Sequence, residues 1–161
     1  MRFAALLALS LVLTAPVRAE DTKCVFCAIL AGEAPGVILT REGDLAAIMS
    51  HKPRNAGHVL VIPLAHAENI YDVPPATFAH MATFAQRVAL AIRASGLPAD
   101  GIQLQLNTGK ASGQSVFHAH LHVIPRVNGE SEPSPSRPVT PAPELEAAAA
   151  KIRAHLAPPA S

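Results

Sequence analysis

The stretch that decides the fold is QSVFHAHLHVIPR (residues 114–126), where three histidines stand at every second position. Residues two apart on a β-strand point to the same face and lie about 6.5–7 Å from one another. The spacing therefore predicts a strand that carries His118, His120 and His122 in one row. The opposite face of that strand would pack on a helix and would consist of Phe117, Ala119, Leu121 and Val123. Buried imidazoles need partners for both ring nitrogens, so the row also predicts a hydrogen-bond network.

Three interpretations of the histidine row are open from its spacing. Three imidazoles could hold zinc and leave one coordination position open. One imidazole could instead attack phosphorus or carbon while its neighbours orient it and protonate the leaving group. The row could also simply face solvent. The preceding loop, NTGKASGQS (107–115), favours the nucleophile, because its glycines let backbone N–H groups converge on an anion opposite the histidines.

Four further strands are expected from the patterns of apolar residues. Runs at 37–40, 45–49 and 58–62 predict three strands, and the alternation in IQLQL (102–106) predicts a half-buried fourth. The connection from this fourth strand to His118 is short, as between antiparallel neighbours.

Two helices accompany these strands. A short helix is expected at 24–31, ended by Gly32. A longer helix should begin at Pro74-Pro75 and end before Gly96 and Pro98. Its apolar residues recur on one face: Phe78, Met81, Ala85, Val88 and Ile92. The order of elements predicts an α+β fold with two helices and a five-stranded, mainly antiparallel sheet.

The first 19 residues have the features of a secretory signal. Arg2 gives a positive start, an apolar stretch follows, and small residues precede a cleavage point before Glu20. The alternatives are a membrane anchor or a core helix, but the apolar run is short for about 30 Å of hydrocarbon. We therefore expect a periplasmic or secreted protein with no stable membrane span after cleavage.

The remaining chain divides by composition. Residues 20–128 predict one domain, 129–143 a Pro/Ser-rich linker, and 144–161 an Ala-rich helix and tail. This last segment could dock through Leu145, Ala149, Ile152 and Leu156 or stay loose. A net charge of +1 offers no broad basic face, so a protein that coats a nucleic acid polymer is not expected.

The sequence resembles the histidine-triad (HIT) superfamily, of the exported bacterial type. The resemblance rests on GQSVFHAHLHVIP (113–125) and extends upstream through CVFCAILAGEAP (24–35), PRNAGHVLVIPLAH (53–66) and LNTGKASGQS (106–115). It implies the HIT-like fold, a homodimer in which two sheets join, and hydrolysis or transfer of nucleotides through a covalent nucleotidyl-histidine at an α-phosphate. Phosphoramidases, dinucleoside polyphosphate hydrolases and enzymes acting on nucleotide sugars all remain open as models.

The resemblance also implies roles for individual residues. His120 would be the nucleophile, oriented by the carbonyl of His118, while His122 and Ser115 would act on the phosphoryl oxygens and the leaving group. The substrate would contact Asn107, Gly113, Gln114, His58 and Ser50. Ser50 stands where nucleoside-binding members commonly carry Asp, and a hydroxyl makes weaker hydrogen bonds than a carboxylate. Asp44 is expected to be a turn residue rather than its substitute.

A metal site is implied by the zinc-bearing branches of the family. Its ligands would be Cys24, Cys27, His66 and His118, a tetrahedral structural zinc site. An oxidising compartment would instead favour a disulfide between the two cysteines. His51, His80 and His155 are expected to be ordinary surface or cap residues. The alternative to a nucleotide enzyme is a zinc-binding or scaffolding protein that keeps the fold without catalysis.

Overall fold

The computed structural model describes residues 24–130 and 138–158. The predicted signal peptide, residues 131–137 of the predicted linker and the last three residues lie outside these ranges. Within them, no helix is long and apolar enough to cross a membrane.

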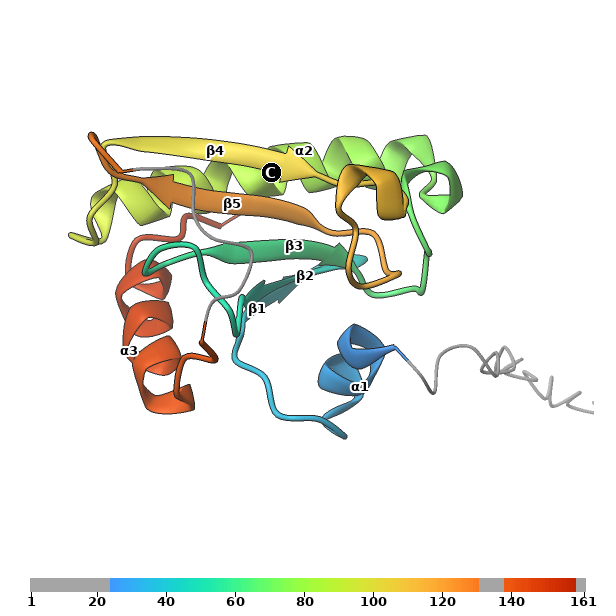
Figure 1. Cartoon of the computed structure of the whole chain (residues 1–161), viewed down its shortest axis with the longest axis horizontal. Coiled ribbons are helices and arrows are strands. Elements are labelled where there is room, and N and C mark those ends of the chain that lie inside the picture. Colours follow the sequence, from blue (N-terminus) through green and yellow to red (C-terminus); the bar gives the residue numbers. More distant parts are fainter. Residues whose placement is uncertain (1–23, 131–137, 159–161) are drawn as a thin grey trace, which may run out of the picture.

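A five-stranded sheet forms the centre of the molecule (Figure 1). Its strands are β1 (Ile38–Glu42), β2 (Leu45–Met49), β3 (Val59–Pro63), β4 (Gly101–Leu106) and β5 (Leu121–Arg126). They lie in the order β1-β2-β3-β5-β4, and every neighbouring pair is antiparallel. The predicted antiparallel α+β fold is therefore confirmed, including the neighbouring positions of β4 and β5.

Helices cover both faces of the sheet. The long helix α2 (Pro75–Ala94) buries Met81, Phe84, Ala85 and Val88 against one face. The short helix α1 (Val25–Ala31) packs Phe26 and Ile29 against the other, with Leu60 and Ile62 of β3. Gly32 ends α1 in the left-handed region, with φ 77°, as its position predicts. Two single-turn 3₁₀ helices, Ile70–Asp72 and Lys110–Ser112, lie in the connections.

A third α-helix among the described residues, α3 (Ala142–Arg153), docks on the domain. Its apolar stripe of Leu145, Ala149 and Ile152 is buried in the same core as α2. The Arg153 side chain donates from Nε to the carbonyl of Leu39 (2.9 Å) and from a terminal nitrogen to the carbonyl of Ile38 (2.8 Å). The predicted Ala-rich helix is therefore present, begins at Ala142 within the predicted linker, and docks on the domain instead of staying loose.

The predicted histidine strand begins later than expected. β5 starts at Leu121, so His118 and His120 precede the strand and only His122 lies on it. The cause is that β4 ends at Leu106, the partner of Leu121, which removes one side of the ladder. Beyond that point the Ala119 N–H donates to the Ala67 carbonyl instead (2.7 Å). Phe117 is half-buried and lies in neither core cluster, in contrast to the prediction.

One side chain of β4 is more exposed than its sequence pattern predicts. Leu104 is 51% exposed, although its alternation with glutamines predicts a buried side chain. The reason is that β4 lies at the edge of the sheet, where α2 covers it only in part.

Candidate active site and metal cluster

The side chain of His120 is buried and held by one short hydrogen bond. Its Nδ1 lies 2.6 Å from the carbonyl oxygen of His118, and its exposed fraction is 3%. A carbonyl only accepts hydrogen bonds, so Nδ1 carries the proton and the Nε2 lone pair is the nucleophilic one. Burial lowers the pKa of His120, although the bond to His118 opposes this, so the ring is neutral at pH 7.

His122 is oriented by a chain of two hydrogen bonds from the loop before β3. The backbone N–H of Arg54 donates to His58 Nδ1 (3.1 Å), so His58 carries its proton on Nε2. That Nε2 lies 2.9 Å from His122 Nδ1 and donates to it. His122 therefore keeps its own proton on Nε2. Burial lowers the pKa of His122 to about 3. The positive charge of Arg54, and that of His120 when it is protonated, contribute to this lowering.

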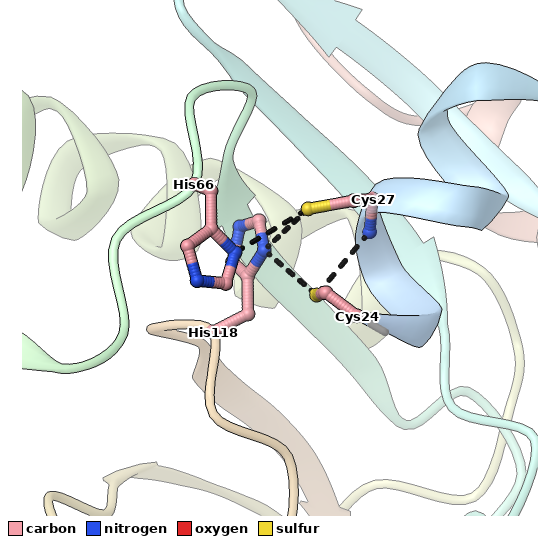
Figure 2. A group of neighbouring side chains, drawn as sticks. All are labelled: Cys24, Cys27, His66 and His118. Carbon is pink, nitrogen blue, oxygen red and sulfur yellow. Dashed lines mark hydrogen bonds between the residues drawn. The ribbon is translucent and has the colours of Figure 1, made fainter. Parts of the chain in front are cut away.

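His118, the first histidine of the motif, turns away from this pair toward two cysteines (Figure 2). His118 Nδ1 lies 3.4 Å from Cys24 Sγ and 3.5 Å from Cys27 Sγ, while His66 Nδ1 lies 3.4 Å from Cys27 Sγ. These four ligand atoms all lie within 4.8 Å of one another. The structure thus brings together all four residues that the sequence assigns to a metal site.

The geometry of this cluster fits a tetrahedral metal ion. Bond lengths of about 2.3 Å to sulfur and 2.0–2.1 Å to nitrogen place S and N ligands about 3.5–3.6 Å apart. The observed separations of 3.4–3.5 Å are close to that value. His118 Nε2 also donates to the carbonyl of Pro63 (2.9 Å), which leaves the Nδ1 lone pair directed at the sulfurs. The donor set and the orientation both suit zinc.

The glycine-rich loop is fastened by Gln114, whose amide is fully used inside the protein. Its Oε1 accepts from the Gly109 N–H (2.7 Å), and its Nε2 donates to the carbonyls of Glu68 (2.7 Å) and Val116 (3.1 Å). The expectation that this side chain donates to a substrate is therefore not met. Gln114 instead determines the shape of the loop, because it is only 4% exposed and has no donor left.

The other predicted substrate contacts lie around this loop. Gly113 adopts the left-handed conformation (φ 88°), and the side-chain Oδ1 of Asn107 accepts from Gln105 Nε2 (2.9 Å). Ser115 is exposed and lines a pocket of 490 Å³ together with Cys24, His66 and Phe117. Ser115 thus lies at an exposed position beside the metal cluster.

Ser50 follows β2 beside His58. Its backbone N–H donates to the His58 carbonyl (3.0 Å), and the residue is 8% exposed. Asp44 lies in the turn between β1 and β2 and bonds to Thr77 and His80, as expected for a residue outside the site. His80 is no ordinary surface residue, because Glu42 and Asp44 contact its two ring nitrogens at 3.0 and 2.9 Å.

Phe26 is a site residue that the sequence patterns missed. Its ring contacts His120 edge-on at a centroid distance of 5.2 Å and His118 at 5.9 Å. It lies between the two cysteines of the C-x-x-C motif, which is the one signal that could have singled it out.

Comparison with family models matches residues 31–129 to the HIT domain. The chain belongs to the HIT domain family. An uncharacterized HIT-like protein of Mycobacterium tuberculosis, Rv1262c, is 46% identical over 107 residues, which cover 66% of this chain and 74% of the relative.

Solved structures of HIT proteins share the fold. A Hit-like protein from Bartonella henselae has a TM-score of 0.78 and 34% identity, covering 86% of this chain and all of that one. A zinc-bound histidine triad family protein from Mycobacterium smegmatis has a TM-score of 0.75 and 43% identity, covering 84% of this chain and 94% of the other.

Two relatives of this HIT protein carry the names of enzymes. Adenylylsulfatase HINT3 of Arabidopsis thaliana is 38% identical over 66% of this chain, which spans about half (53%) of the plant protein. Adenosine 5'-monophosphoramidase HNT1 of Saccharomyces cerevisiae is 31% identical over 69% of this chain and 67% of its own length.

Proposed function

We propose that this HIT protein hydrolyses or transfers nucleotides through a covalent nucleotidyl-histidine at His120. The observation that carries the proposal is the 2.6 Å bond from His120 Nδ1 to the His118 carbonyl. It fixes the tautomer whose Nε2 lone pair can attack phosphorus, and burial keeps the ring neutral. The enzyme names of two relatives, an adenylylsulfatase and an adenosine 5'-monophosphoramidase, support an adenylyl-type substrate.

In the proposed first step, His120 Nε2 bonds to the α-phosphorus as the bond from phosphorus to the leaving group breaks. His122 donates its Nε2–H to a phosphoryl oxygen, since the chain through His58 keeps the proton there. The Ser115 hydroxyl donates a hydrogen bond to the leaving group, which departs with a proton from solvent; the attacking water later returns one proton to solvent. Water then cleaves the Nε2–P bond, which releases the nucleoside monophosphate and restores the neutral imidazole.

Zinc is proposed at the cluster of Cys24, Cys27, His66 and His118. The cluster geometry and the zinc-bound mycobacterial relative both support it. A bound zinc ion would connect the two cysteines at the start of α1 with His118, just before β5. It would take no part in the phosphoryl step.

A homodimer is proposed as well. It is supported by an apolar groove of 450 Å³ between α2 and the edge strand β4, lined by Ala82, Thr83, Gln86, Ala89, Ile102 and Leu104. A second copy that adds along β4 would cover the exposed Leu104. Export to the periplasm or beyond remains a proposal that rests on the sequence of residues 1–19.

The decisive experiment is detection of the covalent intermediate. The protein is mixed with an adenosine phosphoramidate, quenched in milliseconds, and analysed by mass spectrometry for an adenylyl group on His120. His120→Ala should abolish the adduct and lower turnover by about 10⁴-fold or more. Unchanged turnover in that variant would exclude His120 as the nucleophile, whereas neither adduct nor turnover in the unaltered protein would favour the alternative of a non-enzymatic zinc protein.

A further inference from the structure

One residue, His118, belongs to the metal cluster and to the active site at once. Its imidazole points at the two cysteine sulfurs, 3.4 and 3.5 Å away, and its backbone carbonyl accepts the bond that orients His120. The residue is fully buried. A displacement of its ring by the sulfurs would therefore be passed through one residue to the carbonyl that fixes the nucleophile.

The C-x-x-C turn contacts the nucleophile by a second path. Phe26, which lies between Cys24 and Cys27, packs edge-on against both His118 and His120 and is 3% exposed. A movement of the two cysteines would carry this ring with it. The two paths are independent, since one runs through a ligand and the other through an aromatic contact.

The sulfurs of Cys24 and Cys27 can either bind a metal ion or form a disulfide with each other. As thiolates they can hold a metal ion together with His66 and His118. As a disulfide they would be about 2.05 Å apart and would no longer serve as thiolate ligands. Cys24 also lines the 490 Å³ pocket, which is the side from which a small disulfide would approach the cluster.

We infer that the Cys24–Phe26–Cys27 turn is a positioning element for His120, acting through His118, and that a disulfide between the two cysteines releases it. This inference rests on the proposed role of His120 as the nucleophile. The oxidant is a low-molecular-weight disulfide. Two cysteine thiols give up two protons and two electrons, one S–S bond forms in the protein, and the reagent leaves as two thiols. Any bound metal ion is set free in the same step.

The test follows the tautomer of His120 by ¹⁵N NMR in the full zinc-loaded chain, before and after treatment with oxidised glutathione. In the reduced protein His120 should be a single Nδ1–H tautomer. In the oxidised protein it should become a mixture, with one equivalent of zinc released and turnover lowered by about 10²-fold. Dithiothreitol and zinc together should reverse all three changes. A single Nδ1–H tautomer that persists in the disulfide form would overturn the inference.

Two variants separate positioning from general loss of structure. In the double variant Cys24→Ala/Cys27→Ala, oxidised glutathione should leave the His120 signal unchanged, since no disulfide can form. In Phe26→Leu, zinc should bind with the same stoichiometry, yet the tautomers of His120 should mix; one unmixed tautomer there would exclude the path through Phe26. Tautomer and zinc release do not depend on turnover, so failure of the proposed function would be visible separately.

Discussion

His58 Nε2 lies 2.9 Å from His122 Nδ1, and this contact determines where His122 carries its proton. The bond from the Arg54 N–H to His58 Nδ1 makes His58 the donor of the pair. His58, the residue just before β3, thereby directs the proton of His122 on β5 to the proposed phosphate position.

The first prediction concerns this chain of hydrogen bonds. His58→Phe keeps a ring of similar size but removes the donor, so His122 should populate both tautomers. We expect kcat to fall about tenfold to a hundredfold with little change in KM, since the ground state loses no direct contact. His58→Gln, which retains an N–H donor, should lose less. Equal losses in both variants would mean that the hydrogen bond has no role.

The second prediction is the pH dependence of turnover. His120 must be neutral to attack, and burial lowers its pKa below the usual 6.5. His122, with a pKa of about 3, stays neutral over the same range. Activity should therefore fall as His120 takes a proton, with the midpoint of this acid limb below pH 6.5. An acid limb with its midpoint at or above pH 6.5 in kcat/KM would contradict this assignment.

The third prediction concerns Gln114. Replacement by Ala removes the partners of the Gly109 N–H and of the Glu68 and Val116 carbonyls. We expect a loss of about 1–3 kcal/mol in the free energy of unfolding, measured by urea titration, together with reduced turnover. Lys110→Ala, at an exposed position of the same loop, should change the stability by less than about 0.5 kcal/mol.

The fourth prediction uses His80. The carboxylates of Glu42 and then of Asp44 raise its pKa above 6.5. Protonated His80 therefore stabilises the fold fully below pH 6.5, and this contribution disappears as the pH rises through the raised value. His80→Gln should cost up to about 1 kcal/mol at pH 5.5 and little at pH 9. His155→Gln, at an exposed position just after α3, is the matched control and should show no such difference.

The fifth prediction concerns metal removal. A chelator should remove one zinc ion per chain and lower the free energy of unfolding by about 4 kcal/mol, if the ion is supplied at 1,000 times its dissociation constant. Cys27→Ser should lose the metal and resist any further effect of the chelator. Zinc that survives in this variant but is lost in His120→Ala would instead indicate a three-histidine metal centre.

Much of the fold follows from local patterns. The apolar stripe at 75–94 predicts the helix α2, and the apolar run at 45–49 predicts the strand β2. Both predictions succeed because the residues that the structure buries are the apolar ones in the pattern. The start of β5 does not follow, because the period-two spacing continues through His118 while the ladder partner ends at Leu106. Strand boundaries depend on the neighbouring strand, which one segment of sequence does not contain.

The sequence predicted which residues make up the site, but it did not predict all of the contacts between them. The residues of the metal cluster and the three histidines come together as expected from the family resemblance. The satisfied amide of Gln114 depends on carbonyls of Glu68 and Val116, which no pattern in the loop specifies. The contacts of His80 with Glu42 and Asp44 depend equally on how α2 lies against the turn between β1 and β2.

The guanidinium of Arg153 has a consequence for how copies of this chain can associate. It occupies two carbonyls of β1, so this border of the sheet is already bonded where an incoming strand would need acceptors. In the proposed homodimer, strand addition would therefore use β4 at the other border. A pair of chains joined there would present only β1 outward on both sides, and polymerisation into a fibre would stop at two.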